Sequence, residues 1–100
     1  MWHMAKATLI LYRKRRYDDG AILELKLWQV PAAVPGSGHL FKYSLFYGNG
    51  GRRLIGYDNE ASKGDHRHYG DNEEVYAFTG FRQMLADFLA DVRRLRGGKL

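Results

Sequence analysis

The chain has 100 residues, of which 45% are hydrophobic, 27% are charged and 14% are aromatic. This composition is typical of one small globular domain, and it excludes a disordered chain, a collagen-like chain and a multidomain enzyme. The absence of cysteine excludes disulfide bonds, thiolate zinc sites, iron–sulfur clusters and a cysteine nucleophile. We therefore expect a single domain over residues 1–100, with frayed ends at about 1–5 and 97–100.

The sequence gives no indication of a membrane protein or an exported protein. No apolar run approaches the roughly 20 residues that a membrane-spanning helix needs. The first residues lack the long apolar stretch behind a basic region that marks a signal peptide. We therefore expect a cytoplasmic protein.

The formal net charge of +5 comes from one end of the chain. Residues 1–16 contain five basic residues and no acidic residue, whereas the rest of the chain contains equal numbers of each. Four adjacent basic residues create a strong positive field, which favours a polyanion or an acidic partner protein. The alternative is that the basic run at 13–16 is simply a solvated strand end or turn without a binding role. The candidate nucleic-acid-binding residues are this run and two later arginines, namely Arg13, Lys14, Arg15, Arg16, Arg52 and Arg53.

A first β-hairpin is predicted near the start of the chain. Residues 6–12 and 21–30 are rich in strand-forming side chains, and Tyr-Asp-Asp-Gly at 17–20 predicts the turn between them. Because successive side chains in a strand point to opposite faces, one face of the second strand should carry Leu23, Leu25 and Leu27.

A second hairpin should follow the proline- and glycine-containing loop at 31–38. Residues 40–47 alternate, and Gly-Asn-Gly-Gly at 48–51 predicts a turn into a returning strand at 52–57. The apolar face of the first of these strands should carry Phe41, Tyr43, Leu45 and Tyr47.

The second half of the chain predicts a long surface loop, a short strand and a helix. Residues 58–73 show no apolar period and should form the loop, while residues 75–78 can form a fifth strand. Thr79 is expected to cap a helix that ends before Gly97. The apolar stripe of that helix should contain Phe81, Leu85, Phe88, Leu89, Val92 and Leu95. Its opposite face should contain Arg82, Gln83, Asp87, Asp91 and Arg94.

These elements predict an α+β fold. We expect an antiparallel sheet of four or five strands, with one C-terminal helix packed on one face.

The candidate for chemistry is the segment 63–70, which gathers several groups that can move protons or bind phosphate. Histidine exchanges protons near neutral pH, and arginine stabilises charge on phosphate. This is the inventory for metal-free RNA cleavage, and the candidate catalytic residues are His66, His68, Arg67, Lys63 and Tyr69. If the segment is extended, His66 and His68 share a face and Arg67 points away.

Two other interpretations of this segment remain open. A metal ion could be held by His66 and His68 with Asp65, or with Asp58 or Asp71 in its place, but two ligands on one loop are a weak signal. We expect no cofactor. The segment could instead be a polar loop whose histidines bond to nearby carboxylates. His39 follows a glycine-rich turn as a lone histidine, so we expect a structural role for it.

Several segments together resemble a bacterial family. They are Arg-Arg-Tyr-Asp-Asp-Gly at 15–20, Pro-Gly-Ser-Gly-His at 35–39 with Phe-Lys-Tyr at 41–43, Tyr-Asp-Asn-Glu at 57–60, and Lys-Gly-Asp-His-Arg-His at 63–68 with the residues 74–78 behind it. From about Lys6 to Arg96 the chain resembles the TumE family, described as toxin components of toxin–antitoxin pairs. Ser62 stands where members of the family often have glycine.

The resemblance implies a cytosolic protein that inhibits growth. It also implies neutralisation by an antitoxin, typically a helix-turn-helix DNA-binding protein. The leading hypothesis is a toxin that cleaves RNA, with His66 and His68 transferring protons and Arg67 or Lys63 on the phosphate. The alternatives are a non-catalytic module that binds nucleic acid or protein through the basic hairpin end, and a metal-dependent hydrolase.

Overall fold

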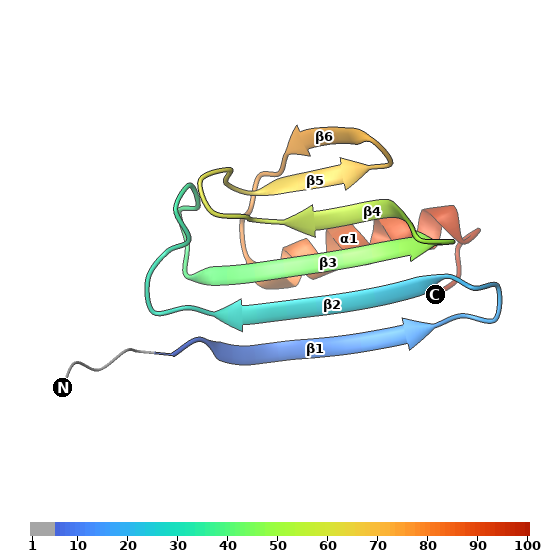
Figure 1. Cartoon of the computed structure of the whole chain (residues 1–100), viewed down its shortest axis with the longest axis horizontal. Coiled ribbons are helices and arrows are strands. Elements are labelled where there is room, and N and C mark those ends of the chain that lie inside the picture. The colour runs from blue at the N-terminus through green and yellow to red at the C-terminus, as the bar shows by residue number, and fades with distance from the viewer. Residues whose placement is uncertain (1–5) are drawn as a thin grey trace.

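The structure, a computed structural model, describes residues 6–100 and consists of an antiparallel sheet followed by one helix (Figure 1). The elements are β1 (Thr8–Arg16), β2 (Ile22–Gln29), β3 (Phe41–Asn49), β4 (Arg52–Asp58), β5 (His66–Tyr69), β6 (Asn72–Val75) and α1 (Phe81–Leu95). The strands lie in the sheet in chain order, and each is antiparallel to the next. The α+β class is confirmed, but the prediction of four or five strands is wrong, because the described residues form six. The end at 1–5, predicted to be frayed, lies outside the described residues.

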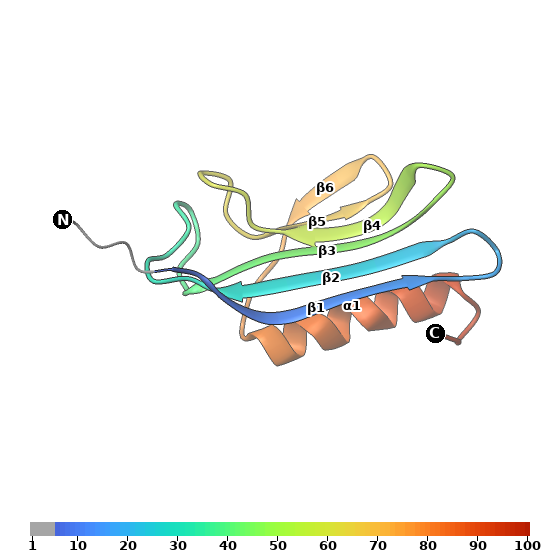
Figure 2. The same cartoon turned by 60° about the horizontal axis from the view of Figure 1, so that its bottom comes forward.

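The first two hairpins form as predicted, and their inner side chains build the core. Strand β2 pairs with β3 so that leucines face aromatic and aliphatic partners: Leu23 with Tyr47, Leu25 with Leu45, and Leu27 with Tyr43. All six side chains are buried beneath α1, which lies along one side of the sheet (Figure 2). Within residues 6–100, no helix is long and apolar enough to cross a membrane.

The helix differs from its prediction at both its start and its buried face. Thr79 does not cap it: the N-cap residue is Gly80, which is extended and makes no side-chain hydrogen bond. Thr79 therefore lies one residue too far upstream to bond the free amides of the first turn. The residues that α1 buries are Met84, Phe88, Asp91 and Val92. Asp91 is thus buried rather than on the opposite face, and Leu95 is 54% exposed rather than packed.

A third hairpin replaces the predicted surface loop at 58–73 and the predicted strand at 75–78. Strand β5 pairs with β4, and β6 pairs with β5 through a turn at Gly70, whose φ is 61°. The sequence pattern conceals these strands because β6 is an exposed edge and the outer side of β5 carries histidines instead of apolar residues. Only Val75 of the predicted fifth strand lies in a strand, and the residues after it connect the sheet to α1.

Arg96 fixes the end of the helix to the first hairpin. Its guanidinium donates to the Tyr47 hydroxyl at 2.9 Å and to Asp19 at 3.0 Å. It also lies 3.6 Å from the ring centroid of Tyr17, a close cation–π contact. The β1–β2 turn and the last turn of α1 are therefore held together by one charged side chain.

We expect Leu27, which is fully buried, and Leu95, which is 54% exposed, to respond very differently to truncation. Leu27→Ala should lower the free energy of unfolding by about 2–5 kcal/mol, because it leaves a cavity in the core. Leu95→Ala removes the same atoms from an exposed position and should cost less than about 0.5 kcal/mol. Urea denaturation of both variants measures the difference, and equal losses would contradict the packing described here.

Candidate functional site

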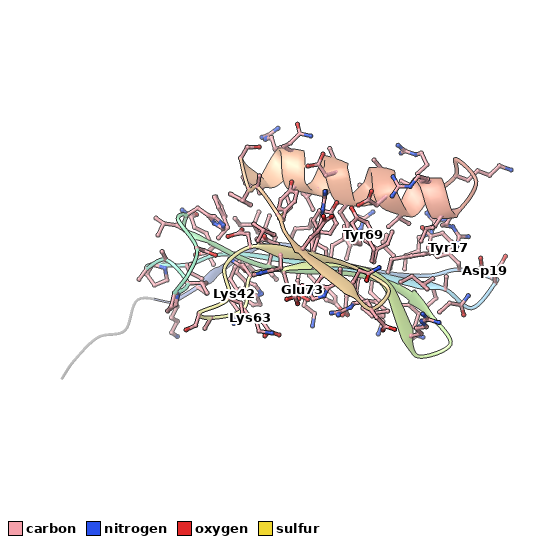
Figure 3. The ribbon with its side chains drawn as sticks, turned by 90° about the horizontal axis from the view of Figure 1, so that it is seen from above. Tyr17, Asp19, Lys42, Lys63, Tyr69 and Glu73 are labelled. Carbon is pink, nitrogen blue, oxygen red and sulfur yellow. The ribbon has the colours of Figure 1, made fainter. Side chains whose placement is uncertain are left out.

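The sheet has one face that α1 covers and one face that it leaves open. Directly paired residues of antiparallel strands share a face, so the register assigns each side chain. We call the side away from α1 the open face, and it carries Leu9, Tyr12, Lys14, Arg16, Ile22, Glu24, Lys26, Trp28, Lys42, Ser44, Phe46, Arg53, Asp58, His66, His68, Glu73 and Val75. Figure 3 shows Lys42, Lys63 and Glu73 on this side, with Tyr17 and Tyr69 between sheet and helix.

His68 lies between two carboxylates on the open face. Its Nε2 is 3.6 Å from Oδ2 of Asp58 on β4, and its Nδ1 is 3.4 Å from Oε2 of Glu73 on β6. The side chain of His68 is 11% exposed, whereas the side chain of Glu73 is 42% exposed. The three neighbouring strands therefore hold this ring from both sides, and the Glu73 side is the more open one.

His66 lies two residues earlier on the same strand and points to the same face. Its Nδ1 is 3.1 Å from the carbonyl oxygen of Gly64. A carbonyl oxygen can only accept, so this bond places the proton on Nδ1 and leaves the Nε2 lone pair free in the neutral ring. The two imidazoles thus make different hydrogen-bonding demands on a ligand.

Arg53 supplies a cation beside this pair of histidines. Gly56 pairs with His68 across the sheet, and a Cβ built on Gly56 would lie 2.7 Å from Cδ of Arg53. The arginine side chain therefore occupies the space that the glycine leaves free on the open face. Asp58 lies within the field of both Arg53 and His68.

Asp58 on the open face has a pKa that differs from its ordinary value. Burial raises the pKa of Asp58 above its ordinary value, while the neighbouring positive charges of His68 and Arg53 oppose the rise. The net direction is upward because burial is the largest of these effects and Glu60 and Glu73 add negative charge nearby. Ionisation of Asp58 is therefore less favourable in the folded state than in the unfolded chain.

The structure does not bring Arg67 and Tyr69 to the open face. Arg67 donates to Glu74 at 2.7 Å and lies over the Tyr69 ring at 5.4 Å, on the side of α1. The Tyr69 hydroxyl donates to Asp91 at 2.7 Å. Lys63 is exposed, with its ammonium 3.8 Å from Glu60. Of the five predicted catalytic residues, the sheet brings His66 and His68 together, with Arg67 pointing away, as expected for an extended segment.

Asp65 belongs to a separate polar network that includes Tyr43, whose side chain projects on the side of α1. It accepts hydrogen bonds from Ser37 at 2.8 Å, from the Tyr43 hydroxyl at 2.7 Å and from Nε2 of His39 at 2.7 Å. Nδ1 of His39 accepts from the Phe41 amide, so both ring nitrogens of this histidine are bonded within the chain. Asp65 is thus committed elsewhere. No group of three or more potential ligands in residues 6–100 is placed to hold a metal ion.

Ser62 is in the left-handed region of backbone space, with φ of 71°. It has this conformation in the turn that leads to Asp65, where its amide donates to the Pro35 carbonyl at 2.6 Å. A residue with a side chain is strained here and glycine is not. This backbone position explains why glycine would be favoured at this point of the chain.

Asp91 forms a second buried site, under the helix, that the sequence pattern does not reveal. Its Oδ2 accepts from the hydroxyls of Tyr57 at 2.5 Å and Tyr69 at 2.7 Å, and Oδ1 accepts from Arg94 at 2.9 Å. Burial alone would raise the pKa of Asp91, but these hydrogen bonds outweigh burial and lower it. Its place next to Val92 in the predicted apolar stripe is the one signal of burial that the sequence offers.

The basic run does not form one patch. Arg13 and Arg15 pair with buried leucines of β2 and project on the helix side, whereas Lys14 and Arg16 project on the open face. Strand β1 is at the opposite edge of the sheet from β6. The run therefore lies four strand positions from the histidines, about 19 Å at the usual strand spacing.

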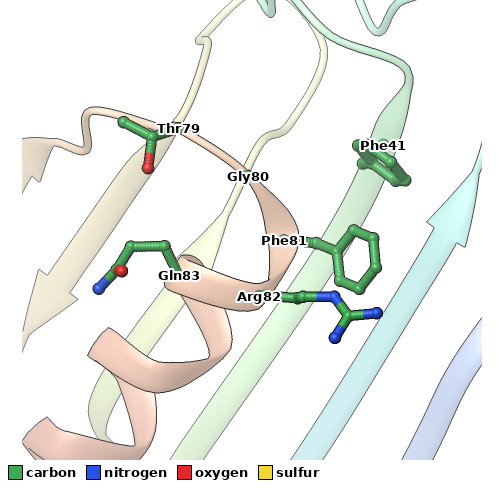
Figure 4. Close-up of a pocket in the computed structure, with 6 residues that line it drawn as sticks. All are labelled: Phe41, Thr79, Gly80, Phe81, Arg82 and Gln83. Carbon is green, nitrogen blue, oxygen red and sulfur yellow. The ribbon is translucent and has the colours of Figure 1, made fainter.

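A shallow pocket opens at the start of α1 (Figure 4). It is lined by Phe41, Thr79, Gly80, Phe81, Arg82 and Gln83. This pocket adjoins the helix, and none of its lining residues belongs to the open face. It is therefore not part of the candidate site.

The fold and site define a small α+β protein with one covered sheet face and one open face that carries paired imidazoles. The chain matches the family model described as Toxin TumE over residues 6–96, and it belongs to that family. Membership indicates the toxin component of a toxin–antitoxin system and hence an antitoxin partner. No curated protein and no solved structure gives a significant match.

The lowered pKa of Asp91 has a consequence for stability. A carboxyl with a lower pKa in the folded state stabilises the fold above its unfolded pKa, and this contribution is lost as the pH falls through the folded pKa. Asp91→Asn should therefore lower the free energy of unfolding at pH 7 by about 1–3 kcal/mol. The difference from wild type should narrow below about pH 4 in urea titrations. A constant difference from pH 7 to pH 3 would contradict this account.

Asp58 should behave in the opposite way, because its pKa is raised. A carboxyl of this kind contributes most below its unfolded pKa, and that contribution is lost as the pH rises. Asp58→Asn should therefore increase the free energy of unfolding at pH 7, by up to about 1 kcal/mol after allowance for solvent screening. The gain should disappear below about pH 4 in the same titrations. A loss of stability at pH 7 would show that Asp58 is held by favourable contacts.

Proposed function

We propose that this toxin cleaves RNA without a metal ion, through the open face of its sheet. The observation that carries the proposal is the pair His66 and His68, which share a face but differ in their neighbours: His66 is hydrogen-bonded to a carbonyl oxygen, and His68 lies between two carboxylates. The Cα atoms of residues two apart in a strand are separated by about 6.6 Å. Two imidazoles at this spacing can flank one phosphodiester.

His66 is the proposed general base. The Gly64 carbonyl holds the Nδ1 proton, so the Nε2 lone pair is available to the proton of a ribose 2′-hydroxyl. A hydrogen-bonded partner of this kind also fixes the orientation of the ring. This histidine therefore suits the first proton transfer.

His68 is the proposed general acid. Both of its neighbours are carboxylates, which accept hydrogen bonds, so the arrangement suits a ring that donates from both nitrogens. The half-exposed Glu73 would give up its place at Nδ1 to the leaving oxygen, while Asp58 continues to orient the ring through Nε2. The 2′-oxygen bonds to phosphorus as His66 takes its proton, and the bond to the 5′-oxygen breaks as His68 protonates it. The products are a 2′,3′-cyclic phosphate and a 5′-hydroxyl.

Arg53 is the proposed phosphate ligand, in the place first expected for Arg67 or Lys63. A guanidinium can stabilise the charge that develops on phosphate by donating two N–H bonds. Arg53 lies over Gly56, the residue that pairs with His68, whereas Arg67 is on the other face. Tyr69 is likewise assigned no catalytic part here, since its hydroxyl is bonded to Asp91.

The rest of the open face supports RNA as the substrate class. Its aromatic side chains Tyr12, Trp28 and Phe46 could stack on bases, and its cations Lys14, Arg16, Lys26 and Lys42 could contact phosphates. We propose that the protein acts in the cytoplasm, where its substrate is found. The helix-turn-helix type of its antitoxin stays a prediction from the family resemblance.

A non-catalytic RNA-binding toxin is the second candidate. The observation that favours it is the low exposure of His68, since a side chain that is 11% exposed cannot meet a leaving group unless Glu73 moves. The same aromatic residues and cations would then bind RNA without cleaving it. Binding that weakens with salt while the strand stays intact would identify this alternative.

Purified protein should cleave a single-stranded RNA oligonucleotide in the presence of EDTA and leave its 2′-O-methyl counterpart intact. His66→Ala and His68→Ala should each lower the rate constant by about 10²–10⁴-fold, the usual contribution of an acid or base. Arg53→Gln should lower it by about 10²-fold. Arg93→Gln, on the exposed side of α1, is the matched control. Gel analysis of the products and their cyclic phosphate ends measures these effects.

A modified substrate separates the two histidines. An RNA with a bridging 5′-sulfur has a leaving group that needs no proton, so it should restore cleavage by His68→Ala but not by His66→Ala. The reverse rescue would exchange the two roles. Wild-type cleavage rates in both His66→Ala and His68→Ala would refute the proposed site. An Arg67→Gln variant that folds normally but loses as much cleavage rate as Arg53→Gln would also refute it.

A further inference from the structure

The outer edge of β1 is a long strand edge without a partner among residues 6–100. Strand β1 spans nine residues and pairs with β2 on one side alone (Figure 1). All of its residues except Leu11 are exposed. Such an edge presents a row of free N–H and C=O groups that can pair with another extended chain.

This edge has two halves of different chemistry. The first half is apolar, with Leu9 at 49%, Ile10 at 40% and Tyr12 at 49% exposure. The second half is the basic run 13–16, whose side chains project on both sides of the sheet. No ion pair joins the four cations of this run to an acid within residues 6–100.

The other edge of the sheet does not offer a comparable surface. Strand β6 has four residues, and its two glutamates are engaged within the chain, Glu74 by Arg67 and Glu73 by His68. A second copy of the chain also fits β1 poorly. Pairing β1 with itself would gather two basic runs along one junction with no acid to balance them, which is the usual way in which edge charges prevent self-association.

We propose that the β1 edge binds an extended segment of a partner protein, which adds as a seventh strand and carries acidic residues in one half and apolar residues in the other. The acidic half would lie along residues 13–16 and the apolar half along residues 8–12. The antitoxin that the family implies is the partner for which this edge is suited. The inference does not depend on RNA cleavage, because the open-face histidines lie four strand positions away.

A synthetic nine-residue peptide tests the proposal, with four consecutive glutamates and then alternating valine and threonine, made in both chain directions. NMR of the ¹⁵N-labelled full-length chain should show slowed hydrogen exchange of β1 amides on addition of at least one of the two peptides. A peptide with lysine in place of glutamate should not bind. A glutamate peptide with alternate N-methylated amides should bind at least about tenfold more weakly, because it keeps the charge but loses the main-chain donors.

Charge-reversal variants locate the contact. Arg13→Glu/Arg15→Glu should weaken binding of the glutamate peptide by at least about tenfold, whereas Arg93→Glu/Lys99→Glu makes the same charge change in α1 and in the segment after it, and should leave binding unchanged. Circular dichroism confirms that both variants fold. Amide protection in β5, β6 or α1 instead of β1, or equal binding of the N-methylated peptide, would overturn the proposal. So would protection of β1 by a uridine oligonucleotide or by self-association alone, which would identify RNA or a second copy as the occupant.

Discussion

A single helix of fifteen residues is the only cover that the described chain has for a six-stranded sheet. A helix is about 10–12 Å wide with its side chains, whereas six strands span about 24 Å. The helix lies along β3 and β4, and the apolar strand residues that are almost fully buried, such as Leu27, Leu45 and Ile55, lie on the helix side of β2, β3 and β4. No element within residues 6–100 covers the opposite face, which carries charged and polar side chains together with aromatic ones such as Trp28 and Phe46. Because the one helix packs on one face, that face stabilises the fold and the other face is available for function.

Tyrosines on the helix side of the sheet bond to the helix itself. Tyr57 on β4, Tyr69 on β5 and Tyr76 after β6 donate hydrogen bonds from their hydroxyls to the helix carboxylates Asp91 and Asp87. A tyrosine can bury its ring and still satisfy its hydroxyl, so this residue suits the boundary of a small core. The same solution appears at the other end of the sheet, where Tyr43 bonds to Asp65.

Much of this fold was accessible from the sequence, because alternation and turn residues define the first two hairpins. The third hairpin was not, since an edge hairpin with histidines outside and Arg67 inside has no apolar period to detect. For the candidate site, extended geometry correctly placed His66 and His68 on one face. The contribution of Arg53 was hidden, because it depends on pairing between β4 and β5 and on a glycine in a neighbouring strand. The buried Asp91 was hidden because its tyrosine partners are distant in sequence.

The position of Arg53 follows from an irregularity in pairing. Along β4 the register changes from Tyr47 opposite Ile55 to Gly48 opposite Arg53, so Leu54 is an extra residue. Without this shift, strict alternation would place Arg53 on the helix side with Ile55 and put a leucine on the open face. The bulge instead aims a guanidinium toward the bare backbone of Gly56, beside His68. Strand alternation therefore places Arg67 on the helix side, away from the imidazoles. The extra residue Leu54 places Arg53 on the open face beside them instead.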